Sequence, residues 1–460
     1  MTSPASTICC SGCGYVAGPD DPYPFRCPLA GTDDTDHVLT RVLAPGARFP
    51  SGGELNPFVR YRALMYPYHV ALARGLSDAD YRHLVASLDA SVAAVGGHGF
   101  RVTPFFRSRE LSESLAFSAA GGVWVKDETR GVAGSHKGRH LMGVLIHLAV
   151  MEASGLLGPA SRGSRPGRPS RPNLAIASCG NAALAAAVLA RAGGWRLTVF
   201  VPPGADAGTV GRLRELAADV VVCPRERDVP GDPAYLRLRG ELARGALPFT
   251  TQGTENGLAI EGGETLGYEL VTDLAGSAGG PGGGLDHLII QVGGGALASS
   301  CIQALREAVE LGELGQLPRI HTVQTCGAHP LERAYRRVRA SLPDEPGPEA
   351  VGQAMATAVA HRSAFMQAWE TEPTSVATGI LDDETYDWRA VVEGMLITGG
   401  RPLVVSEHSL AEANRLAVAR TGIGVDPTGS AGLGGLLDMR RSGAIGADDR
   451  VGVLFTGRRR

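Results

Sequence analysis

The stretch KDETRGVAGSHKGRH, from Lys126 to His140, decides how the rest of the chain is interpreted. A strand-like run, GGVWVKDE (121–128), leads into it, and a helical pattern from His136 to Met151 follows. Lys137 therefore stands in a polar turn, directly after the residues 134–136, where a helix is expected to begin. A lysine at such a place is either ordinary surface charge or a nucleophile held in a crowded turn.

From about residue 120 onward, short apolar runs alternate with helical patterns. The strand-like runs are GGVWVKDE, NLAIAS, LTVFVP, VVVCP, HLIIQVGGG, RIHTVQTC, RPLVVSE and VGVLFTG. Near-continuous apolar strands that alternate with helices are typical of parallel sheets covered by helices on both faces. The sequence therefore predicts an α/β fold with mostly parallel sheets, and the chain has room for two such sheets.

Composition narrows the class of protein. At about 100–200 residues per domain, 460 residues suggest two or three domains. A net charge of −3 argues against nucleic acid as the main partner. The N-terminus lacks the basic start and apolar run of an export signal, and LMGVLIHLAVM is shorter than the ~20 residues that span a bilayer. We expect a cytoplasmic protein that binds a small molecule and no membrane.

Three segments rich in Pro, Gly or Ser are expected to be surface loops: 158–173, 275–286 and 341–350. Each lies between an expected helix and the next element. They are interpreted as insertions and not as domain linkers. The first, at 158–173, is either a lid or only an insertion.

Two further turns point to a site that binds anions. ASCGN (177–181) follows a strand and opens a helix, so backbone N–H groups are exposed there, and Asn181 adds a donor and an acceptor. Three glycines, 293–295, follow another strand and let the backbone approach a phosphate closely. Ala298 replaces the last glycine of a dinucleotide motif, and no P-loop ending follows. Helix capping and a plain tight turn are the structural alternatives.

The order GSHK, ASCGN, VGGG resembles fold-type II pyridoxal-phosphate enzymes, the tryptophan synthase β superfamily, over roughly residues 55–457. The resemblance implies that Lys137 is the Schiff-base lysine and that Asn181 bonds the cofactor's 3′ oxygen. It implies that Thr456 faces the pyridine nitrogen and that His136 lies beside the cofactor. The implied phosphate cradle consists of Gly293, Gly294, Gly295 and Ala296.

Within that group the chain is most similar to threonine synthases, through SVATGILD, GIGVDPTGSAGLGGL, VLFTG, NPFVRYR and TPFF. The segment ENGLAIEGGETLGYEL also matches an E-G-x-x-T helix with Glu261 and Thr265. Threonine synthases usually carry Ser-Phe-Lys-Asp-Arg, whereas this chain carries SHKGR at 135–139. A histidine before the lysine resembles the tryptophan synthase β chain, and Cys179 stands where serine or glycine is usual.

The resemblance implies a lyase that performs elimination or replacement at Cβ or Cγ, as in the conversion of O-phosphohomoserine to threonine. A serine/threonine ammonia-lyase, a cysteine-synthase-like β-replacement enzyme and a non-catalytic binding protein remain alternatives. Lys137 would act as nucleophile and then as general base, and both roles need the neutral amine. The family also suggests a homodimer. The expected substrate-binding residues are Ser135, Arg139, Ser178, Cys179 and Gly180.

The N-terminal cysteines form a separate cluster. Cys10, Cys13 and Cys27 resemble half of a zinc ribbon, which His37 would complete as a Cys3His site unless Cys9 joins it. A degenerate ribbon without metal is the alternative.

The expected domains follow from these motifs. Residues 1–45 form a zinc-ribbon-like segment. Residues 46–125 and 251–460 form a large cofactor-binding domain, and 126–250 form a small domain with Lys137 and the Asn181 loop.

Overall fold

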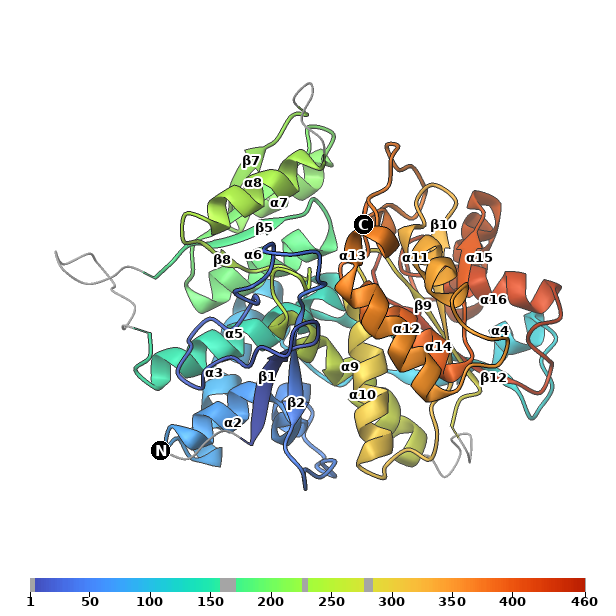
Figure 1. Cartoon of the computed structure of the whole chain (residues 1–460), viewed down its shortest axis with the longest axis horizontal. Helices are drawn as coiled ribbons and strands as arrows, with labels where there is room; N and C mark the ends of the chain where they lie inside the picture. Colours follow the sequence, from blue (N-terminus) through green and yellow to red (C-terminus); the bar gives the residue numbers. More distant parts are fainter. Residues whose placement is uncertain (1–4, 158–170, 226–230, 277–283, 460) are drawn as a thin grey trace. The chain divides into compact units, whose positions relative to one another are not determined.

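The chain forms two compact units in the computed structural model, which describes residues 5–157, 171–225, 231–276 and 284–459 (Figure 1). Unit 1 contains Met1–Cys27, Val38–Arg101 and Lys137–Gly262. Unit 2 contains Pro28–His37, Val102–His136 and Gly263–Arg460. The three-part domain division expected from the sequence stays a prediction.

The expected loops are only partly described. Most of 158–173 and of 275–286 lies outside the described residues, so the choice between lid and insertion stays open. The segment 341–350 joins two helices and continues into the second of them at Pro348. No helix in the part of the chain that the structure describes is long and apolar enough to cross a membrane.

Unit 2 is built on a six-stranded sheet with the order β11-β10-β9-β12-β4-β3. Its strands are β3 (Phe105–Ser108), β4 (Gly122–Asp127), β9 (His287–Gln291), β10 (Arg319–Thr325), β11 (Pro402–Val405) and β12 (Arg450–Phe455). All neighbouring strands are parallel except β3, which pairs antiparallel with β4 at one edge. The prediction of a mostly parallel sheet is confirmed.

The apolar runs explain why this sheet is covered on both faces. Every residue of β4 and of β9 is buried, as expected for strands with helices on either side. The helix α16 (Ala431–Arg441) packs closely on the sheet, because a Cβ added at Gly435 would lie 2.5 Å from Cγ2 of Val323. The other helices of unit 2 are α4 (Arg109–Ser114), α10 (Ala296–Glu310), α11 (Pro330–Arg339), α12 (Pro348–Ala360), α13 (Arg362–Phe365), α14 (Trp388–Thr398) and α15 (Glu407–Thr421), with short 3-10 turns η2 (Glu128–Arg130), η3 (Val132–Gly134) and η4 (Thr378–Ile380).

Unit 1 contains a smaller parallel sheet with the order β7-β6-β5-β8. Its strands are β5 (Leu174–Ala177), β6 (Leu197–Val201), β7 (Asp219–Val222) and β8 (Leu247–Pro248). Its helices are α1 (Pro57–Arg60), α2 (Tyr66–Ala73), α3 (Asp78–Gly96), α5 (Lys137–Ala153), α6 (Asn181–Gly193), α7 (Ala207–Glu215) and α8 (Pro233–Leu242), with the 3-10 turn η1 (Arg62–Leu64). The helix α9 (Leu258–Gly276) begins in unit 1, and its residues from Gly263 on belong to unit 2.

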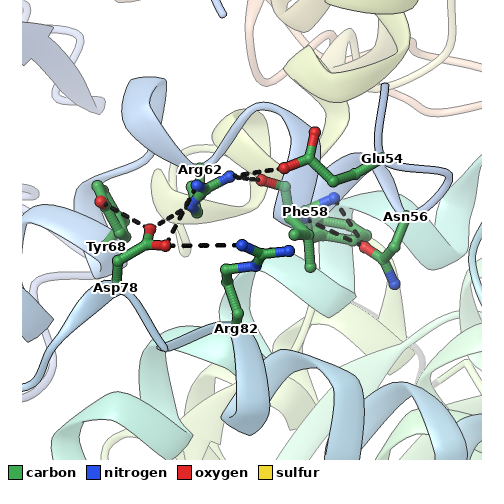
Figure 2. A network of polar contacts seen from close by, with 8 residues as sticks. Glu54, Asn56, Phe58, Arg62, Tyr68, Asp78 and Arg82 are labelled. Atoms are coloured by element: carbon green, nitrogen blue, oxygen red, sulfur yellow. Dashed lines mark hydrogen bonds and ion pairs between the residues drawn. The ribbon is translucent and has the colours of Figure 1, made fainter. Parts of the chain in front are cut away.

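A polar network fixes the stretch NPFVRYR in unit 1 (Figure 2). Asn56 caps α1 by accepting from the backbone N–H groups of Phe58 and Val59. Arg62 donates through Nε to Oδ1 of Asp78 at 2.5 Å, so the η1 turn is tied to the first residue of α3 (Figure 2). This stretch, which carries part of the family resemblance, is therefore held by caps and ion pairs within unit 1.

A two-stranded antiparallel sheet opens the chain, formed by β1 (Ser6–Cys10) and β2 (Leu39–Leu43). Cys10 pairs with Leu39 at the end of this ladder. The ladder thus brings Cys10 near the end of the segment 13–37, which contains the other expected metal ligands.

Candidate functional site

Lys137 is the first residue of α5, one residue later than the helix start expected from the sequence. Its Nζ donates to Oγ1 of Thr251 at 3.5 Å, and both residues belong to unit 1. One turn further along α5, burial and then the charge of Lys137 lower the pKa of His140 to about 3. The imidazole is therefore neutral at physiological pH, and its Nδ1 donates to the backbone oxygen of Ala259 at 2.8 Å.

The sequence contains only two lysines, Lys126 and Lys137. Lys126 is fully buried, with its Nζ 2.7 Å from Oε2 of Glu269 and 2.8 Å from the backbone oxygen of Thr103. A charged amine held in such a pair is unsuited to act as a nucleophile. Lys137 is therefore the lysine through which a carbonyl cofactor could be attached.

The loop 177–181 of unit 1 leads from β5 into α6. Gly180 is the N-cap residue of α6 and offers no side chain to the first N–H groups of the helix, which lack acceptors inside it. Ser178 is held by its N–H to the backbone oxygen of Phe200 at 3.1 Å, and its Oγ accepts from the N–H of Gly180 at 3.4 Å. The helix start with Asn181 as first residue can therefore receive a carboxylate or another anion.

In unit 2 the glycine loop follows β9 and precedes α10. Gly295 is the N-cap of α10 with φ +98, a left-handed conformation that favours glycine. As at α6, no side chain caps the first N–H groups of α10, so these donors face outward from the helix start. The loop fits a phosphate group on this ground.

The same glycine loop packs against the segment 380–387, which begins within the stretch SVATGILD and to which the sequence interpretation gave no role in the site. A Cβ added at Gly293 would lie 2.2 Å from Oδ2 of Asp382, and one at Gly294 would lie 2.9 Å from Cδ2 of Tyr386. Thr385 Oγ1 donates to the backbone oxygen of Gly293 at 3.0 Å. The glycines are thus required by packing as well as by any ligand. The acidic run DDETYD was the available signal for this second contact.

Thr456 directly follows β12 in unit 2 and is 2% exposed. Its backbone oxygen accepts from the N–H of His136 at 3.1 Å and from Nδ1 of the same histidine at 3.2 Å, so Nδ1 carries the proton. Ser135 pairs with Gly457 in an antiparallel bridge. The structure therefore brings the residues before Lys137 together with Thr456 and Gly457, which directly follow β12. His136 contacts Thr456 with both its backbone and its ring.

The remaining expected substrate residues differ in exposure. Ser135 and Arg139 are 1% and 3% exposed, whereas Cys179 is exposed in the loop before α6. These positions fit several roles, and substrate binding by them stays a prediction. Taken unit by unit, the donors fit pyridoxal phosphate: an amine and an amide side chain in unit 1, and an open helix start and a buried hydroxyl in unit 2.

The expected metal ligands come together near the N-terminus. One ligand atom from each of Cys10, Cys13, Cys27 and His37 lies within 4.8 Å of the other three. The sulfurs of Cys13 and Cys27 are 3.7 Å apart, close to the ~3.8 Å edge of a tetrahedron with Zn–S bonds of about 2.3 Å. Cys9, the alternative ligand, turns toward the backbone oxygens of Cys10 and Gly14 instead. The zinc-ribbon-like segment is thus a Cys3His cluster.

Residues 98–457 match the family described as "Pyridoxal-phosphate dependent enzyme". Threonine synthase of Methanocaldococcus jannaschii is 22% identical over 77% of this chain and 74% of its own length. Threonine synthase of Mycobacterium tuberculosis is 25% identical over 61% of this chain and 66% of its own length.

Two solved structures have a similar fold. The L-serine ammonia-lyase of the fungus Rhizomucor miehei matches with a TM-score of 0.55 and 19% identity, over 78% of this chain and 94% of that one. Diaminopropionate ammonia lyase of Escherichia coli matches with a TM-score of 0.58 and 16% identity, over 82% and 88% of the two chains. Both identities are low, so these matches show the fold alone.

Proposed function

The chain belongs to the family of pyridoxal-phosphate dependent enzymes, and from this premise we propose that it is a lyase acting at Cβ or Cγ of an amino acid. The reaction is elimination or replacement, of the kind that converts O-phosphohomoserine to threonine. The threonine synthases among its relatives support this choice. When bound, pyridoxal phosphate supplies the electron sink for such chemistry.

Lys137 attaches the cofactor through Nζ and afterwards acts as the base at the substrate's Cα–H. The observation that carries this assignment is that Lys126, the other lysine, is fully buried in an ion pair. The position of Lys137 at the start of α5 supports it further, because the positive end of a helix favours the neutral amine.

The other contacts to the cofactor are assigned to the residues that the family resemblance implies. Asn181 bonds the 3′ oxygen, and Thr456 faces the ring nitrogen with His136 holding its strand in place. The phosphate is held by the backbone N–H groups of Gly293, Gly294, Gly295 and Ala296. The substrate's α-carboxylate binds the helix start after Ser178, Cys179 and Gly180, with Ser135 and Arg139 as further donors.

A product assay tests the reaction. Purified protein with O-phospho-L-homoserine is expected to release threonine and phosphate, and Lys137→Ala is expected to release neither. Lys126→Arg, which keeps the charge beside Glu269, serves as the matched lysine control and should retain turnover. Turnover by Lys137→Ala would overturn the role of that residue, and no turnover by the unchanged protein would remove this substrate.

A serine/threonine ammonia-lyase is the second candidate. The L-serine ammonia-lyase of Rhizomucor miehei has a similar fold, and such a reaction would use the same cofactor contacts. Release of a 2-oxo acid from serine or threonine would support this candidate. Formation of a substituted amino acid from an O-activated serine would instead support β-replacement.

We also propose that the N-terminal cluster binds one structural zinc ion. Four ligands leave no open position for a substrate, as in structural zinc sites. Asp33 Oδ1 lies 3.0 Å from Nε2 of His37, which leaves Nδ1 for the metal and orients the ring as an outer-sphere carboxylate does.

Elemental analysis of the purified chain tests the zinc site. About one zinc per chain is expected, lost in Cys10→Ser and in Cys13→Ser. Cys9→Ser is the matched control, because Cys9 is adjacent in sequence but its sulfur is directed at the backbone oxygens of Cys10 and Gly14. Equal zinc in all variants would contradict the ligand assignment.

We also propose that the protein forms a homodimer, as the family resemblance suggests. Light scattering of the purified protein should give twice the mass of one chain, and the mass of a single chain would contradict it. The cytoplasmic location stays a prediction.

A further inference from the structure

Gln291 is the last residue of β9 and stands two residues before the glycine loop. It lies in the middle of the sheet of unit 2, because β9 is flanked by β10 and β12. Its side chain is buried, with 4% of its surface exposed. A buried carboxamide at this position contacts the strand end that carries Thr456.

Two backbone oxygens fix which way the carboxamide faces. Nε2 of Gln291 lies 2.8 Å from the oxygen of Gly429 and 3.1 Å from the oxygen of Leu454. Carbonyl oxygens only accept hydrogen bonds, so the amide nitrogen must be the atom that faces them. The orientation of Gln291 therefore follows from its neighbours and is not a matter of choice between nitrogen and oxygen.

This orientation determines the direction of the hydrogen bond to Thr456. Nε2 of Gln291 also lies 2.7 Å from Oγ1 of Thr456. An amide nitrogen carries two N–H groups and does not accept, so one N–H is shared between two of the three oxygens and the hydroxyl of Thr456 is an acceptor in this pair. The proton of that hydroxyl must then point away from Gln291.

The hydroxyl proton has no acceptor within the described residues, although Thr456 is 2% exposed. A buried donor without an acceptor is unfavourable, so such an arrangement is expected where a ligand supplies the missing acceptor. Because the Thr456 hydroxyl accepts the hydrogen bond from Gln291, it can only donate to a ligand.

We propose that Gln291 is a positioning residue that makes the Thr456 hydroxyl an obligate hydrogen-bond donor to an unprotonated ring nitrogen. The inference rests on the proposed function, because it takes Thr456 to face the cofactor ring. A protonated pyridinium could not accept from this hydroxyl, so the ring stays neutral in the protein. A neutral ring withdraws electrons less strongly, which suits reactions in which a β or γ group leaves promptly.

A cycle of two variants tests the inference by cofactor binding, measured by fluorescence titration of protein freed of cofactor. Thr456→Val removes the hydroxyl at nearly constant shape, and Gln291→Met removes the donor at similar volume. Each single variant is expected to weaken cofactor binding about tenfold, the effect of one hydrogen bond. The double variant should bind no more weakly than Thr456→Val, because Gln291 acts through Thr456.

A spectroscopic titration separates positioning from a merely structural role. In Gln291→Met the Thr456 hydroxyl is free to turn and accept, so the cofactor band should titrate with pH where the unchanged protein shows a constant band. Thermal unfolding of the cofactor-free variants reports the loss of the bonds to Gly429 and Leu454 separately.

Three results are diagnostic. Additive effects in the double variant, or an unchanged pH titration in Gln291→Met, would overturn the role of Gln291. If the unchanged protein itself binds no pyridoxal phosphate, the proposed function fails first, and this result differs from additivity in a protein that binds it.

Discussion

Replacing Lys126 by methionine should strongly destabilise unit 2. Lys126 and Glu269 are both fully buried, and their charged atoms lie 2.7 Å apart. Oε2 of Glu269 also accepts from the backbone N–H of Thr103 at 3.0 Å, while Lys126 donates to the backbone oxygen of the same threonine. The variant removes the cation and leaves the carboxylate buried among the groups that remain.

The complete burial of the ion pair sets the expected loss of stability in Lys126→Met. Removing one partner of a buried ion pair costs roughly 3–5 kcal/mol, because the other charge is left uncompensated. For a domain of about 150–250 residues, each kcal/mol shifts the midpoint of thermal unfolding by about 2–4 °C, so a fall of about 10 °C is expected. The double variant Lys126→Met, Glu269→Gln removes both charges and keeps an acceptor for Thr103, so it should recover most of the loss.

Unfolding by urea and by heat, followed by circular dichroism, measures the free energy of unfolding and the thermal midpoint. The unchanged chain, the single variant and the double variant are compared. A free energy of unfolding for Lys126→Met within about 1 kcal/mol of that of the unchanged chain would contradict a stabilising buried pair, since removal of one partner is expected to cost several times that. A double variant as unstable as the single one would show that methionine packs badly there and that charge is not the cause.

Two further predictions concern stability. Burial lowers the pKa of His140 to about 3 and that of His147 to about 4, against ~6.5 in the unfolded chain. Between roughly pH 4 and 6 the unfolded chain therefore binds more protons than the folded chain. The free energy of unfolding should fall with decreasing pH by up to ~1.4 kcal/mol per pH unit for each histidine. Equal urea midpoints at pH 5 and pH 7 would contradict this. A Cβ at Gly143 in α5 would lie 2.7 Å from Cα of Gly262, so Gly143→Ala should destabilise by ~1–3 kcal/mol. Gly211→Ala in α7, where nothing lies within 4 Å, should be neutral or slightly stabilising, and equal losses in both variants would count against the packing argument.

The strands of the two larger sheets, apart from β3 and the two-residue β8, could be predicted because short apolar runs in the sequence indicate buried strands. β4 and β9 are continuous apolar runs, and each proved to be buried along its whole length. The antiparallel edge strand β3 was not predicted, because four residues of FFRS with only one buried position carry little periodicity. The neighbours of β12 in the sheet, β4 and β9, lie far from it in sequence, and this pairing has no local signal either.

Those parts of the candidate site that lie in turns with a recognisable sequence motif could be predicted. A helix start beside Lys137, within one residue of where α5 begins, and a cluster of Cys10, Cys13, Cys27 and His37 were both expected, and the structure contains both. Sequence alone left open whether Cys9 or His37 is the fourth ligand, since only the geometry turns Cys9 away. The contacts that Gln291 and Asp382 make depend on segments far away in the chain, which spacing in the sequence cannot reveal.

Reduction of the purified, cofactor-loaded protein with borohydride, followed by peptide mapping, tests directly whether Lys137 binds the cofactor. The chain has two lysines, so the outcome is unambiguous. We expect a reduced cofactor fixed on the peptide that contains Lys137, and no such product in Lys137→Ala. A cofactor fixed on Lys126 or on the N-terminal amine would contradict the assignment of Lys137.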